Sequence, residues 1–169
     1  MKKIMIIAVS FLFLAGCGKD GSFDPDVLKK NGKVTLPIFD KLQSDPDPKP
    51  TTQCGGSLFY GTMTYLGDVH GISVSKTCSY NTAGTQLAIT SEDTVHATNG
   101  EQLWTKGSIV ITFPTDGTTT ATITGGSKIV GGTGRYAGAT GYFIYENMVY
   151  DLVTGHESHT AHGKITFTR

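Results

Sequence analysis

Apolar side chains recur at every second position along much of the chain after residue 57, with Ser, Thr and Lys between them. This spacing is typical of strands that bury one face. The clearest examples are Leu87, Ile89, Ile109, Ile111, Phe113, Ile165 and Phe167. No stretch in this part of the chain has a helical apolar period of useful length. The pattern therefore predicts an all-β, antiparallel domain.

Eight strands are expected, near residues 57–66, 69–78, 85–91, 93–98, 101–113, 118–130, 141–151 and 158–168. Asn99-Gly100 predicts a hairpin with a type I′ turn, and Asp116-Gly117 predicts a second turn. Closure into a barrel would bury one face of every strand and leave no free sheet edge. A two-sheet sandwich has the same alternation and is the alternative.

The segment before this domain differs in composition. It contains Asp45-Pro46-Asp47-Pro48-Lys49-Pro50, in which each proline removes a backbone donor. We interpret residues 17–53 as a lipidated N-terminus and flexible tether, followed by a β-barrel domain at 54–169. An apolar patch interrupts this tether and could dock on the domain or on a partner. Its members are Val34, Leu36, Ile38, Phe39 and Leu42.

Residues 1–16 have the organisation of a bacterial export signal. Met1-Lys2-Lys3 precedes an apolar run from Ile4 to Leu14. This run is too short to cross a bilayer, which needs about 20 residues. Leu14-Ala15-Gly16-Cys17 resembles the lipobox of bacterial lipoproteins and predicts a lipid thioether on Cys17. An ordinary secretory signal with a chance cysteine is the alternative.

Lipidation would determine where the protein lies. The several acyl chains of a lipoprotein hold it firmly to a membrane. The Gly18 that follows the cysteine resembles the pattern of lipoproteins sorted to an outer membrane. We therefore expect a lipid-anchored outer-membrane protein whose body faces the periplasm or the cell surface.

The charge of the chain restricts its expected partners, and its cysteines suggest a covalent link. Removal of the signal leaves 12 basic and 14 acidic residues, so nucleic acid is not an expected partner. Cys54 and Cys78 would lie in an oxidising compartment, where a disulfide between them is the economical prediction. It would contribute about 3 kcal/mol by loop entropy. A reactive thiol is the alternative.

The segment Gly131-Gly132-Thr133-Gly134-Arg135-Tyr136-Ala137-Gly138-Ala139-Thr140-Gly141 contains five glycines. It resembles a recurring turn of the allene oxide cyclase and dirigent barrel superfamily, especially a bacterial branch of unassigned function. Residues 61–67 and 98–103 are similar to two other stretches of that branch. The resemblance covers about residues 57–169 and implies a closed eight-stranded antiparallel barrel.

The glycine segment is better explained as a structural turn than as an anion site. Its glycines permit left-handed or tightly packed backbone, Tyr136 can plug the barrel end, and Arg135 can face solvent or cap carbonyls. It lacks the Gly-Lys-Ser/Thr ending of a P-loop and precedes a strand. The structural role is assigned to Gly131, Gly132, Gly134, Arg135, Tyr136, Gly138 and Gly141.

The residues that could line a lumen are Tyr60, Trp104, Tyr145 and Glu146. Glu146 and Asn147 are adjacent on a strand, so at most one of them can point inward. The plant enzymes of this superfamily act on a reactive intermediate inside the barrel. The resemblance outside the glycine turn fixes no register, so none of their catalytic residues is assigned to this sequence.

His156, His159 and His162 suggest a metal site at first sight. On a strand, however, His159 would face away from the other two, so three ligands would not converge. A polar loop entering the last strand is the preferred interpretation. We expect no metal and no cofactor.

Three functions are compatible with this sequence. The favoured one is a non-enzymatic barrel that binds a small apolar ligand in its lumen or a protein at its rim. The second is an isomerase or cyclase, as the superfamily resemblance implies. The third is a structural or adhesive surface module.

Overall fold

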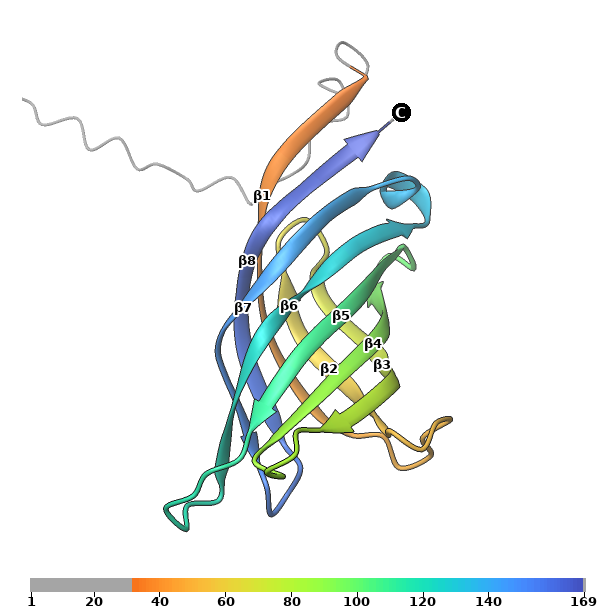
Figure 1. Ribbon diagram of the computed structural model, residues 1–169. Coiled ribbons are helices and arrows are strands. Elements are labelled where there is room, and N and C mark those ends of the chain that lie inside the picture. The colour runs from red at the N-terminus through yellow and green to blue at the C-terminus, as the bar shows by residue number, and fades with distance from the viewer. Residues whose placement is uncertain (1–31, 169) are drawn as a thin grey trace, which may run out of the picture.

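Eight antiparallel strands follow one another around a single closed barrel in a computed structural model that describes residues 32–168 (Figure 1). The strands are β1 (Lys33–Pro46), β2 (Gly56–Met63), β3 (Gly67–Tyr80), β4 (Gln86–Ala97), β5 (Gln102–Thr112), β6 (Thr120–Gly132), β7 (Thr140–Asp151) and β8 (Glu157–Thr168). Each strand pairs with its neighbours in sequence, and β1 pairs with β8 to close the wall. The predicted closed eight-stranded barrel is confirmed, and the sandwich alternative is excluded.

The predicted boundary between tether and barrel is wrong, because β1 lies inside the segment 17–53. Residues 33–44 of β1 pair with β8, and residues 40–46 pair with β2. The predicted tether residues before 32, with Cys17 and the signal segment, lie outside the described residues. The prolines obscured β1, but Pro37 lies where β1 pairs with β8 alone, and a free edge tolerates a residue without an N–H.

Two predicted strands, 85–91 and 93–98, form the single strand β4. Glu92, which lies between the two predicted strands, points outward and pairs with Lys76 and Lys106, at 2.9 and 3.1 Å. Asp93 points into the barrel. The predicted number of eight was therefore right although one strand was missed and another was divided.

The hairpin at Asn99-Gly100 is present, but its turn is not type I′. Gly100 has φ of 84°, whereas Asn99 is not among the residues with positive φ. The Gly100 N–H donates to the Ala97 carbonyl, and the Ala97 N–H donates to Glu101. This is the geometry of a three-residue hairpin loop, which needs only one left-handed position.

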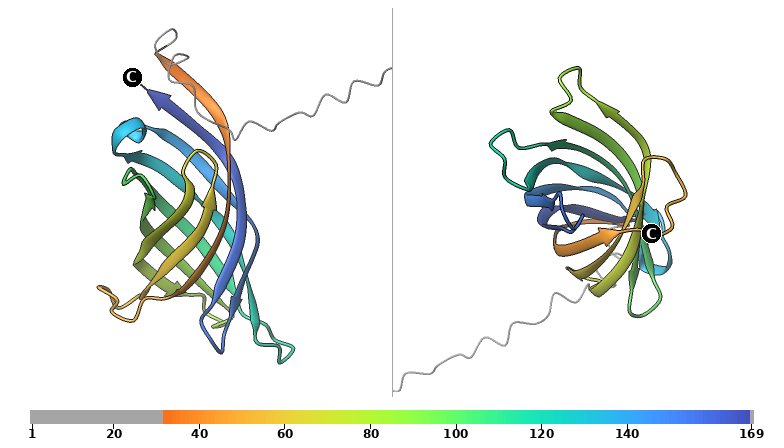
Figure 2. Two further views of the ribbon diagram at one scale, coloured as in Figure 1. Left: turned by 180° about the vertical axis from the view of Figure 1, so that it is seen from behind. Right: turned by 90° about the horizontal axis from the view of Figure 1, so that it is seen from below.

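The barrel has two different ends, which Figures 1 and 2 show from several sides. One end carries the start of β1, the end of β8 and the short 3-10 helix η1 (Gly134–Tyr136). The other end carries the β1–β2, β3–β4, β5–β6 and β7–β8 connections. We call them the η1 end and the mouth.

Buried apolar side chains concentrate toward the η1 end. Six of them are almost completely buried: Tyr136, Phe167, Ile38, Leu103, Ile129 and Ile165. A second, smaller apolar cluster of Ile111, Ala121, Ile123 and Met148 lies apart from the first. The alternation predicted from the sequence thus places its apolar face inward, and the larger of the two clusters fills the η1 end of the barrel.

Candidate functional site

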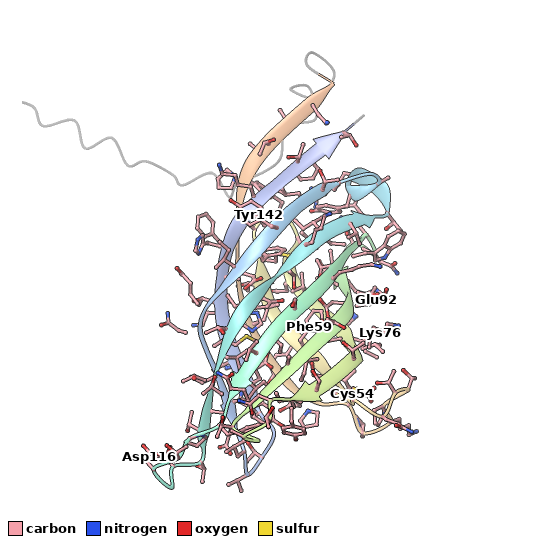
Figure 3. The ribbon with its side chains drawn as sticks, in the orientation of Figure 1. Cys54, Phe59, Lys76, Glu92, Asp116 and Tyr142 are labelled. Atoms are coloured by element: carbon pink, nitrogen blue, oxygen red, sulfur yellow. A yellow bond between two sulfur atoms is a disulfide. The ribbon has the colours of Figure 1, made fainter. Side chains whose placement is uncertain are left out.

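The interior of the barrel is hollow between the apolar plug and the mouth. A cavity of about 520 Å³ is lined by residues from all eight strands. Pockets that hold small molecules usually measure about 300–1,000 Å³. Figure 3 shows Phe59, one of its lining residues, inside the barrel and Cys54 at the mouth.

The η1 end is closed by hydrogen bonds as well as by packing. The Tyr136 hydroxyl donates to the Tyr65 carbonyl at 2.9 Å, and Arg135 donates to the same oxygen at 2.6 Å. Arg135 also forms an ion pair with Glu101 at 2.9 Å. Burial raises the pKa of Tyr136 to about 12, so its phenol stays protonated and able to donate. Ligand entry at this end would require these contacts to break.

Apolar side chains line the cavity near the mouth. They come from β4, β5 and β7 and from the connection after β5: Leu87, Ile89, Ile109, Ile111, Phe113 and Met148. Leu87, Ile89, Ile109 and Phe113 remain partly exposed on the lumen side. This surface could pack against the apolar body of a ligand.

The cavity also has polar lining residues, among them Asp93 on β4. The Asp93 carboxylate accepts hydrogen bonds from the Ser73 and Thr105 hydroxyls, at 2.6 and 2.7 Å. Burial raises the pKa of Asp93, while these hydroxyls and that of Ser91 favour its ionised form. Both of its oxygens therefore already have partners.

Asp40 is less well satisfied than Asp93. It lies on β1, is only 8% exposed, and its Oδ1 has no hydrogen-bond partner among the described residues. The nearest basic group is Nε2 of His159, at 3.6 Å. Burial raises the pKa of Asp40 to about 6, and the nearby His159 partly opposes that rise.

His159 lies between two carboxylates on the lumen wall. Its Nε2 faces Asp40, and its Nδ1 lies 3.4 Å from Glu157. Neither nitrogen has a hydrogen bond of good geometry among residues 32–168. The ring of Tyr145 approaches it edge-on, with 4.9 Å between centroids. Asp40 and His159 thus have buried polar atoms without partners in the cavity wall, beside the Glu157 carboxylate.

Tyr145 is the one predicted lumen residue that the structure places in the cavity. Its hydroxyl is hydrogen-bonded to that of Ser127. Burial raises the pKa of Tyr145, and the charge of Asp93 raises it further. At neutral pH this phenol is therefore a neutral hydrogen-bonding group.

The other three predicted lumen residues, Tyr60, Trp104 and Glu146, lie on the outer face. Tyr60 and Trp104 are 44% and 40% exposed, because each follows an inward residue, Phe59 and Leu103. Glu146 pairs with His162 on the outside, at 3.2 Å. Aromatic character suggests Tyr60 and Trp104 as lumen residues, whereas alternation from their buried neighbours places both of them, and Glu146, outside.

A bulge explains why neither Glu146 nor Asn147 points inward. Tyr145 and Met148 both face the lumen, although they are three residues apart, and pairing with β8 shifts register between Glu146 and Val149. Asn147 has φ of 51°, a left-handed conformation that asparagine tolerates. The extra residue keeps both exposed side chains outside.

The glycine segment forms the turn that the sequence suggested. Gly134 and Gly138 have φ of 55° and 71°, which favours glycine at both positions. A Cβ at Gly132 would approach the Gln102 carbonyl to 2.1 Å. Tyr136 plugs the η1 end as predicted, and Arg135 caps a carbonyl.

The predicted disulfide joins Cys54 and Cys78, whose Cα atoms are 5.6 Å apart. Cys54 precedes β2 and also lines the mouth, and Cys78 lies on β3. The bond ties the β1–β2 connection to the wall. The disulfide therefore helps to hold the entrance of the cavity in place.

The three clustered histidines separate as expected. His159 points inward, His162 outward, and His156 pairs with Asp45 at 2.9 Å. Within residues 32–168, no three His, Cys, Asp or Glu side chains are arranged to hold a metal ion. Interpreting this segment as a polar loop missed the lumen role of His159.

Sequence reasoning did not identify the polar centre of the site. Asp40 was hidden in the predicted tether, Asp93 at a predicted strand boundary, and Glu157 and His159 in a segment interpreted as a polar loop entering the last strand. One signal was available: Ser73, Ser75, Ser91 and Ser127 occupy inward positions where a packed core would have large apolar residues. Small inward residues indicate a hollow lumen.

Comparison with known proteins gives a fold likeness only. No family model and no curated protein sequence matches the chain. Among solved structures, it is similar to the pterocarpan synthase dirigent protein GePTS1, with 16% identity and a TM-score of 0.46. That match covers 88% of this chain and 99% of the other. In the described part of the chain, no helix is long and apolar enough to cross a membrane.

Proposed function

We propose that this protein is a lipid-anchored barrel that binds a small, mainly apolar molecule in its lumen. The observation that carries the proposal is the cavity of about 520 Å³, which combines an apolar wall with unsatisfied buried polar groups. A packed interior would have favoured a purely structural or adhesive module. Buried polar atoms without partners are rare in folded proteins, so their presence in a cavity favours a ligand that satisfies them.

The direction of the barrel suits an anchored binding protein. β1 begins at the η1 end, so the chain that leads to Cys17 joins the barrel on the side opposite to the mouth. The entrance would then face away from the point where the chain joins the anchor. The cavity would thus be accessible to molecules in the surrounding aqueous compartment.

The proposal predicts that filling the lumen blocks binding. The neutral fluorophore N-phenyl-1-naphthylamine becomes bright in apolar surroundings, so it should report entry into the cavity. We expect Ile109→Trp, which adds bulk to the lumen wall, to lower its affinity by about tenfold or more. The matched control is Ser108→Trp, on the outer face of the same strand. Equal fluorescence in both variants would contradict lumen binding.

A second candidate is an isomerase or cyclase. It is favoured by the Asp40 carboxyl, whose pKa of about 6 would let it exchange a proton near neutral pH beside His159 and Tyr145. Mass spectrometry of a bound molecule before and after incubation separates the two functions. A binding protein returns its ligand chemically unchanged.

A further inference from the structure

Negatively charged side chains outnumber positively charged ones in the lining of the lumen. Four carboxylates line the cavity, those of Asp40, Asp47, Asp93 and Glu157. Within residues 32–168 no lysine or arginine lines it, and His159 is its one basic side chain. In a partly desolvated site such an imbalance disfavours anions and favours cations.

The carboxylates differ in whether they can still accept a hydrogen bond. Asp93 is already occupied by the Ser73 and Thr105 hydroxyls. Oδ1 of Asp40 has no hydrogen-bond partner among the described residues, and Asp40 is more than nine-tenths buried. The buried acceptor of the cavity wall that still lacks a partner is therefore Oδ1 of Asp40.

The contacts of His159 do not neutralise this site. Its Nε2 is 3.6 Å from Asp40, and its Nδ1 is 3.4 Å from Glu157, with poor hydrogen-bond geometry at both. Even one positive charge on this ring would leave an excess of carboxylates around it. A second cationic donor would satisfy Asp40 and reduce the excess.

We propose that the lumen selects a ligand with a protonated amine joined to an apolar body, the amine bound at Asp40 and the body against the apolar wall. This inference rests on the proposed lumen binding and adds the ligand's chemical class. An ammonium group donates up to three hydrogen bonds and accepts none, which suits acceptors without donors. A carboxylate ligand would meet repulsion from Asp40, Asp93 and Glu157.

The test compares three head groups on one apolar chain. Dodecylamine, dodecanol and dodecanoate compete with N-phenyl-1-naphthylamine at about pH 8, where the amine is charged. The protein is residues 17–169 carrying Cys17→Ser, which contains all eight strands and no acyl chain of its own. Only displacement that Ile109→Trp reduces is counted as lumen binding. We expect dodecylamine to bind at least about tenfold more tightly than dodecanol, and dodecanoate more weakly than both.

Two variants assign the preference to named carboxylates. Asp40→Asn keeps the shape and removes the charge, so the preference for dodecylamine over dodecanol should fall to less than about threefold. Glu157→Gln, a second lumen variant, should reduce it in the same direction. Asp68→Asn removes the same charge from the outer face of β3 and should leave it unchanged.

The outcomes distinguish the two proposals. Equal binding of dodecylamine and dodecanol, or a preference that survives both lumen variants, overturns the amine inference and leaves lumen binding intact. A failure of all three compounds and of the fluorophore to bind overturns lumen binding as well. Cooperative thermal unfolding of each variant confirms that the comparison is made on folded protein.

Discussion

Asp40 shows at the scale of one residue how the lumen is specialised. Its carboxyl is buried on β1 with Oδ1 unsatisfied, and burial raises its pKa from 3.8 to about 6. The folded protein therefore holds the proton to higher pH than the unfolded chain does. This destabilises the fold increasingly as the pH rises from about 4 to about 6, and fully above that range. A residue that destabilises its own fold is more consistent with a role in binding than with one in stability.

Asp40→Asn should therefore stabilise the protein at about pH 8 and have little effect near pH 3.5. The shift from 3.8 to about 6 corresponds to an increase of up to about 3 kcal/mol in the free energy of unfolding at the higher pH. Urea denaturation at the two pH values measures the difference, with exposed Asp68→Asn as the control. Destabilisation at pH 8, or the same effect at both pH values, would contradict the assignment.

At the scale of elements, β1 decides whether the barrel closes. It pairs with both β2 and β8, places Ile38 and Leu42 in the core, and carries Asp40 into the lumen. Without it, β2 and β8 would each present an unpaired edge. The strand that looked like part of a linker is therefore necessary for both the fold and the site.

A chain that starts at Cys54 should fail to form the native barrel, whereas one that starts at residue 32 should form it. The shorter chain loses both ladders of β1 and the two buried apolar side chains of Ile38 and Leu42, each worth about 2–5 kcal/mol in a core. Near-ultraviolet circular dichroism and thermal unfolding compare the two chains. Cooperative unfolding of the shorter chain at the same temperature would show that β1 only docks on a complete domain.

At the scale of the whole molecule, the features that could be predicted from the sequence are those that follow from a repeated pattern of residues. Alternation at Ile109, Ile111 and Phe113 located a buried face, and the glycine turn located Tyr136 at a barrel end. The site was harder to predict because it breaks the same alternation. Asp40 and Asp93 occupy inward positions where an alternating pattern leads one to expect apolar residues. Asp40 was therefore assigned to the tether, and Asp93 to the boundary between two predicted strands.

The most direct test of the account asks whether the lumen is open at the mouth and closed at the η1 end. Ile109 lines the cavity, whereas Ile129 is fully buried in the plug, so Ile109→Cys and Ile129→Cys form a matched pair. Each is made in the Cys17→Ser chain with the Cys54–Cys78 disulfide intact and treated with a small water-soluble methanethiosulfonate. We predict rapid labelling at 109 and labelling at least about a hundredfold slower at 129, where reaction needs unfolding. Equal rates at the two positions would contradict the account.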